Sequence, residues 1–141
     1  MAQGLSRRDL QRIAQAKIDD ALLLFTNHRF SNAYYLAGYA VEIGLKACIA
    51  KMMSAEVIPD KRFILDIHTH DLRSLVGTAG LKGSLKSKEV SDPAFAANWS
   101  LACQWTPDCR YSSVDPYTAQ TMIVAITSPH SGVLEWIKAH W

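Results

Sequence analysis

The stretch from Tyr34 to Ala47, YYLAGYAVEIGLKA, constrains the fold more than any other part of this chain. Its small residues let a second helix approach closely, and its leucine, valine and isoleucine side chains supply apolar surface to bury. Glu42 and Lys46 stand four residues apart, so a helix places them side by side on one face, which Tyr35 and Tyr39 continue at helical spacing. We therefore predict a core helix with one polar strip, which serves either as a register-fixing ion pair or as a wall of a ligand groove.

Start and stop signals on either side of this segment predict a helical hairpin. Ser6 followed three residues later by Asp9 is close to a capping box, and the apolar period after it continues to about Thr26. The second helix, which contains the segment above, is expected from Phe30 or Ser31 to Met53. Because only a short break separates the two helices, we expect them to run antiparallel.

The second half of the chain carries further helix signals. Thr69 can cap a short helix that ends at Gly77 or Gly80. Asp92-Pro93 and Asp115-Pro116 each combine an acidic cap with a proline at the first helical position. The first of these helices should end before Thr106-Pro107, and Pro129 should kink or break the last one near Ser128.

Two segments lack a clear period, and no segment reads as a strand. We expect residues 57–66 to be irregular and residues 82–91, KGSLKSKEVS, to form a polar loop. The four tryptophans are expected to be core or dimer contacts, with Trp141 as the most exposed of them. The predicted fold is a single all-α domain over residues 1–141, an antiparallel four-helix bundle with an additional short helix.

Composition bounds the protein class. With 141 residues, 49% hydrophobic and 20% charged, the chain is typical of one globular domain. A formal net charge of +2 permits a nucleotide or RNA partner without requiring one. Three cysteines without framework spacing favour a reducing cytoplasm, and Cys48 reads as a small core residue. No apolar run approaches the ~18 residues of a membrane span, so we expect a soluble, cytoplasmic protein without a membrane partner.

Four blocks of the sequence, AYYLAGYAVEIGLKA at 33–47, HDL at 70–72, WTPDCRY at 105–111 and VLEWIKAHW at 133–141, resemble the HEPN family. Members of this family are small helical domains found beside prokaryotic nucleotidyltransferases. The resemblance implies an antiparallel four-helix bundle that forms a homodimer. It also implies a nucleotide or RNA ligand, a nucleotidyltransferase partner as in toxin–antitoxin pairs, and no cofactor.

The family is best known for metal-independent RNA cleavage by an arginine followed, after four to six residues, by a histidine. Arginine can hold the scissile phosphate with two hydrogen bonds, and histidine can move a proton at the 2′-hydroxyl or the leaving oxygen. Arg110 stands in the corresponding place, but no histidine occurs among the seven residues after it, which end at Tyr117. Arg62 precedes His68 by six residues, yet it lies in the expected irregular segment. The resemblance therefore does not decide whether the protein is an enzyme.

The candidate ligand-binding residues come from two blocks. From the first block we select Tyr35, Tyr39, Glu42 and Lys46; the second contributes Arg110 and Tyr111. Arg110 would meet phosphate, or it is instead ion-paired with Asp108 or Asp115.

The histidines of the H-x-H at 68–70 have several interpretations. The resemblance makes His70 a structural residue whose ring hydrogen-bonds to the backbone near the short helix, with a place beside Arg110 as the alternative. His68 and His70 lack the convergent ligands of a metal site, so no metal is expected.

Three functions follow from these observations. The leading hypothesis is a HEPN-like, non-catalytic homodimer that binds a nucleotide or RNA and works with a nucleotidyltransferase, without reading DNA sequence. The alternative is a metal-independent RNase toxin that uses Arg110, with the base supplied by His70 or Tyr117. The third hypothesis is a helical assembly module that binds no nucleotide.

Overall fold

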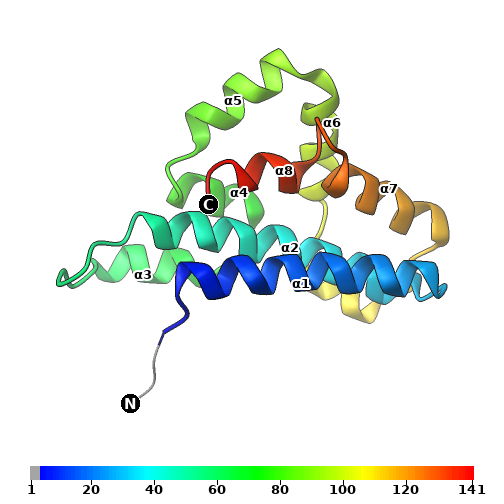
Figure 1. The fold of residues 1–141 in the computed structure, drawn as a ribbon, viewed down its shortest axis with the longest axis horizontal. Coiled ribbons are helices and arrows are strands. Elements are labelled where there is room, and N and C mark those ends of the chain that lie inside the picture. Colours follow the sequence, from blue (N-terminus) through cyan, green and yellow to red (C-terminus); the bar gives the residue numbers. More distant parts are fainter. Residues whose placement is uncertain (1–3) are drawn as a thin grey trace.

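The computed structural model describes residues 4–141, in which helices are joined by short connections (Figure 1). The elements are α1 (Arg7–Thr26), α2 (Phe30–Lys51), α3 (Lys61–Ile67), α4 (Leu72–Thr78), α5 (Lys82–Ser91), α6 (Pro93–Ala102), the 3₁₀ helix η1 (Pro107–Tyr111), α7 (Pro116–Thr127) and α8 (Val133–Lys138). Between residues 4 and 141 there is no strand, so the predicted all-α class is confirmed. No helix in this range is both long and apolar enough to cross a membrane.

Helices α1 and α2 form the predicted antiparallel hairpin, in which they run side by side (Figure 1). The capping box is present: the Ser6 hydroxyl accepts from the Asp9 amide at 3.1 Å, and the Asp9 carboxylate accepts from the Ser6 amide at 3.1 Å. After α1 the chain turns at His28, which has a φ of 60° and lies in the left-handed region. The predicted end of α1 and start of α2 are confirmed.

Helix α2 is the central element, since α1, α4, α7, α8 and η1 all pack against it. Eleven of its residues are buried, and most of these are alanine or glycine. A Cβ at Gly44 would lie 3.0 Å from the Ile137 side chain of α8, and one at Gly38 would lie 2.2 Å from the Trp105 ring. Small residues therefore let neighbouring side chains rest directly on the backbone of α2.

Both Asp-Pro pairs start helices as predicted. The Asp92 carboxylate accepts from the amide of Phe95 at 3.0 Å at the start of α6, and the Asp115 carboxylate accepts from the amide of Thr118 at 2.7 Å at the start of α7. Pro129 lies between α7 and α8, so the predicted break near Ser128 is also confirmed. The last predicted helix is thus two separate helices.

The prediction of a polar loop over residues 82–91 is wrong, because these residues form α5. Leu85 packs against the core, while Lys88 pairs with Asp92 at 3.0 Å and lies 5.6 Å from the Phe95 ring centroid. These contacts stabilise α5, although the segment has too few apolar residues at helical spacing to predict a helix from the sequence. As a result the described chain has eight α-helices, where the sequence predicted four main helices and a short one.

The prediction that residues 57–66 are irregular is wrong for their second half, where α3 begins at Lys61. The Asp60 carboxylate caps this helix by accepting from the amides of Arg62 and Phe63 at 3.0 and 3.4 Å. Phe63 and Ile67, four residues apart, pack against the core. Tertiary packing of these two side chains therefore stabilises a helix of only about two turns.

The Asp92 side chain connects α5, α6 and the segment between α7 and α8, and its bonds make the stability of the fold depend on pH in acid. Its carboxylate accepts from the Phe95 amide, Lys88 and the Ser131 hydroxyl, and these bonds hold its pKa below the usual 3.8, the Phe95 bond most. Because the folded pKa is the lower one, the stabilisation is present above about pH 3.8 and is lost as the pH falls through the folded pKa. We expect Asp92→Asn to lower the melting temperature by a few degrees at pH 7 and by progressively less toward pH 2.

Thermal unfolding followed by circular dichroism between pH 2 and 7 measures this difference. The control is Asp20→Asn on exposed α1, which should match the wild-type protein at every pH. A wild-type minus Asp92→Asn difference that does not change with pH would contradict this account of Asp92.

Candidate functional site

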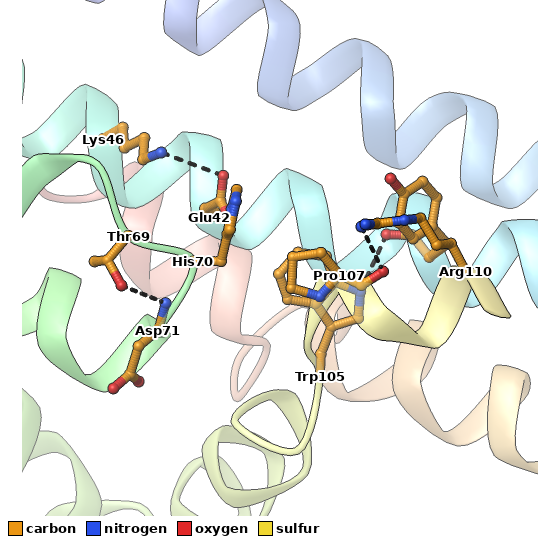
Figure 2. Close-up of polar contacts among 9 residues, drawn as sticks. Glu42, Lys46, Thr69, His70, Asp71, Trp105, Pro107 and Arg110 are labelled. Atoms are coloured by element: carbon orange, nitrogen blue, oxygen red, sulfur yellow. Dashed lines mark hydrogen bonds and ion pairs between the residues drawn. The ribbon is translucent and has the colours of Figure 1, made fainter. Parts of the chain in front are cut away.

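A buried carboxylate on α2 holds a histidine from the loop before α4. Glu42 is 3% exposed and is the only charged residue buried within residues 4–141. Its Oε1 lies 2.5 Å from Nδ1 of His70, and its Oε2 lies 3.4 Å from Nζ of Lys46 (Figure 2). Each carboxylate oxygen thus has its own partner. Since an ionised carboxylate only accepts, His70 donates from Nδ1, and the ring's Nε2 remains available.

This geometry corrects the predicted role of His70. Its ring bonds to the Glu42 side chain, whereas the resemblance implied a bond to nearby backbone. The short helix is capped by Asp71, which accepts from the amide of Arg73 at 3.0 Å. The prediction that Thr69 caps this helix is wrong, because Thr69 lies two residues before the cap and accepts from the Asp71 amide at 3.2 Å. These two turns fix the backbone on both sides of His70.

Trp105 positions the second element of the site, η1. Its ring lies against Gly38, and its Nε1–H donates to the carbonyl oxygen of Tyr35 at 3.2 Å. The indole is 2% exposed, so η1 is anchored directly to the middle of α2. Five residues later this helix carries Arg110, whose Nη1 donates to the carbonyl oxygen of Pro107 at 3.1 Å.

The Arg110 side chain is exposed. In the described part of the chain it makes no ion pair, so the predicted pairing with Asp108 or Asp115 is not present. Its guanidinium lies 4.6 Å from the centroid of the Tyr111 ring. Tyr111 also raises the pKa of Arg110, so that the cation is kept at all ordinary pH values.

His70 and Arg110 line the same cleft, which has a volume of about 450 Å³. Thr69 and His70 form one wall, and Trp105, Pro107 and Arg110 form the other; Figure 2 shows Trp105 and Pro107 between His70 and Arg110. A cleft of this size accommodates a nucleotide-sized group.

Two carboxylates and one thiol, those of Asp71, Asp108 and Cys103, also line the cleft. Asp71 is occupied by its capping bonds to Arg73 and Ser74, whereas Asp108 makes no ion pair within residues 4–141. Burial raises the pKa of the Cys103 thiol to about 11, so it stays protonated and is a poor nucleophile near neutral pH. Arg110 and His70 therefore supply the guanidinium and imidazole nitrogens of the cleft, and the hydroxyls of Thr69 and Thr106 line it beside them.

The remaining predicted residues lie beside the cleft without lining it. The rings of Tyr35 and Tyr39 are 5.0 Å apart, and Tyr39 lies 5.0 Å from Trp105 and 6.2 Å from His70, measured between centroids. Burial, and then the neighbouring Tyr35, raises the pKa of Tyr39 to about 12, so its hydroxyl stays neutral.

Lys46, predicted to bind the ligand, and Tyr117, considered as the base, do not line the cleft. Lys46 lies one turn after Glu42 on α2 and forms an ion pair with it at 3.4 Å. Tyr117, considered as a base, lines other cavities with Tyr34 and Phe30, so it does not share the cleft of Arg110. His70 is thus the candidate base that the fold brings to Arg110.

Sequence reasoning missed the parts of the site that depend on distant residues. It paired Glu42 with Lys46, which is confirmed, but not with His70, which lies 28 positions away. Trp105 was predicted only as a core or dimer contact. A glycine in the middle of an apolar helix, Gly38, is the one local signal that a bulky side chain rests there.

His68 and His70 do not form a metal site in this structure. Within residues 4–141 no group of three or more histidine, cysteine, aspartate or glutamate side chains is arranged to hold a metal ion. The cysteines in this range are free, and Cys48 is buried in the core as predicted. Of the tryptophans, Trp99, Trp105 and Trp136 are buried and Trp141 is partly buried against the core.

Comparisons of the chain with family models, curated proteins and solved structures found no match in any of the three. The resemblance to the HEPN family therefore stays a prediction that rests on the four sequence blocks. The functional argument that follows starts from the cleft between His70 and Arg110.

Proposed function

We propose that the cleft between His70 and Arg110 binds a phosphate group of a nucleotide or RNA, in a HEPN-like protein of the cytoplasm. The observation that carries this proposal is that an unpaired arginine and an oriented histidine, from separate elements, line one cleft of about 450 Å³. Arg110 presents the planar donors that bind phosphate with two hydrogen bonds. Exposed Tyr111, stacked beneath it, offers a face on which a base can stack.

The contact between Glu42 and His70 favours a second function at the same cleft, metal-independent RNA cleavage. With Nδ1–H donated to Glu42, neutral His70 has an Nε2 that can take the proton of a 2′-hydroxyl. The 2′-oxygen then bonds to phosphorus, the bond from phosphorus to the 5′-oxygen breaks, and the 5′-oxygen takes a proton from water. The products are a 2′,3′-cyclic phosphate and a 5′-hydroxyl, and His70 later returns its proton to solvent.

The wider setting follows from the resemblance and is part of the proposal. The four helices of the antiparallel bundle would be α1, α2, α6 and α7, of which α1 packs on α2, α2 on α7, and α7 on α6. The protein would act as a homodimer with a nucleotidyltransferase partner. A helical assembly module that binds no nucleotide is the competing hypothesis, and the experiment below separates the two.

We expect Arg110→Ala to weaken binding of a labelled single-stranded RNA by about tenfold or more, because a charge-assisted pair of hydrogen bonds to phosphate is removed. Fluorescence anisotropy in metal-free buffer measures this. Arg8→Ala is the matched control, since it removes the same charge from an exposed position at the start of α1. Equal affinity of Arg110→Ala and wild type, or no binding by the wild type, would contradict the proposal and favour the assembly module.

The same reactions, separated on a denaturing gel, report cleavage. If the second function holds, wild-type protein gives products that end in a 2′,3′-cyclic phosphate, and His70→Ala gives none while it still binds RNA. Binding without any cleavage by the wild type would leave the cleft as a binding site alone.

A further inference from the structure

A second and larger cavity, of about 640 Å³, lies among α3, α4 and the start of α5. Its charged side chains are Asp66, Arg73 and Lys82. Neither Arg73 nor Lys82 forms an ion pair with any carboxylate in the part of the chain that the structure describes. The cavity therefore carries an excess of one positive charge, with both cations free to meet an anion.

Lys82 is held over the cavity by the shape of α4. A Cβ at Gly77 would lie 2.9 Å from Cε and 3.6 Å from Nζ of Lys82. The lysine side chain therefore lies across the glycine, in space that any larger residue would occupy. Arg73 reaches the same cavity from the preceding turn of α4.

The hydroxyl groups of the cavity divide into occupied and free donors. Ser74 donates to the Asp71 carboxylate at 2.9 Å, and Thr78 donates to the Ser74 carbonyl oxygen at 3.2 Å. Thr69 instead accepts, from the Asp71 amide at 3.2 Å, and its own O–H is left to donate. The donors available to an anion are thus Arg73, Lys82 and Thr69.

Thr69 lines both this cavity and the cleft of His70 and Arg110, so the two hollows meet at the loop before α4. Each holds at least one unpaired cation. Different phosphates of one strand would find donors on either side of Thr69, whereas a mononucleotide would fill only one hollow.

We propose that the cavity of Arg73 and Lys82 binds another backbone phosphate of the strand that is held at Arg110, so that the ligand is a single-stranded oligonucleotide. This inference rests on the proposed function of the Arg110 cleft. It adds the ligand's class and a second site. The strand would run from η1 past Thr69 toward the start of α5.

The test compares a labelled eight-nucleotide RNA with adenosine 5′-monophosphate as ligands. The variant is Arg73→Gln with Lys82→Gln, and the matched control is Arg62→Gln with Lys86→Gln. The control removes the same charge from exposed positions on α3 and α5 outside the cavity. We expect the cavity variant to bind the octamer about tenfold more weakly and the mononucleotide equally well, while the control stays within about twofold. The slope of log affinity against log salt should fall by about 0.7 for each phosphate that the variant no longer binds.

The outcomes separate this inference from the function on which it rests. If Arg110→Ala weakens octamer binding but the cavity variant does not, the second phosphate site is overturned and the proposed function stands. Equal reductions in the cavity variant and the control also overturn it, because net charge then explains the effect. If the wild type binds neither ligand, both proposals fail. Melting temperatures of all variants confirm that they are folded.

Discussion

Gly38→Ala is expected to destabilise the protein by about 2–4 kcal/mol. A Cβ at this position would lie 2.2 Å from three atoms of the Trp105 indole. The ring is 2% exposed and its Nε1–H is bonded to α2, so it cannot move aside without breaking that bond and opening a cavity. Helix propensity alone would favour alanine over glycine by about 0.5–1 kcal/mol, so the sign of the change reports the packing.

Gly83→Ala is the matched control, because Gly83 lies in exposed α5 and a Cβ added there would meet no atom within 4 Å. It should stabilise the protein by about 0.5–1 kcal/mol. Urea denaturation of both variants measures the two free energies of unfolding. Equal changes in the free energy of unfolding at the two glycines would contradict the close packing of the Trp105 ring against Gly38. Because η1 follows Trp105, we also expect Gly38→Ala to weaken RNA binding at Arg110.

Removing both partners of Glu42 is expected to cost about 3–5 kcal/mol, because it leaves a buried carboxylate unpaired. His70→Ala takes the donor at 2.5 Å from Oε1, and Lys46→Ala takes the donor at 3.4 Å from Oε2. The Glu42 side chain is only 4% exposed, but its partners His70 and Lys46 are 56% and 21% exposed, so water that enters where they are truncated should keep the cost toward the lower end of this range. Adding Glu42→Gln to this double variant removes the charge and should recover about half of the missing stability.

The control for this series is Lys138→Ala, which breaks the Lys138–Glu135 pair at the same 3.4 Å distance on the surface. Glu135 is 44% exposed, and we expect the removal of its partner to cost no more than about 0.5 kcal/mol. Urea denaturation of each variant supplies the comparison. Failure of Glu42→Gln to recover stability in the double variant would show that His70 and Lys46 contribute through packing and not through the buried charge.

Among the helices, those whose signals lie within one or two turns were predictable. Ser6 and Asp9 mark the start of α1, and the proline after Asp92 or Asp115 marks α6 or α7, because a cap acts on amides two or three residues away. α5 was missed for the opposite reason. Its stabilising contacts, from Leu85 to the core and from Lys88 to Asp92 and Phe95, join it to other elements.

What the sequence by itself determined is the all-α class, the hairpin of α1 and α2, and the face of α2 that carries Tyr35, Tyr39, Glu42 and Lys46. Caps, prolines and a helical period decide these features locally. Only the tertiary structure decided which residues share a site. These contacts depend on how the helices pack. The Trp105 ring lies against Gly38, and Glu42 pairs with His70, which is 28 positions away in the sequence. Pairing over such distances follows from the summed packing of the whole core, which no local pattern records.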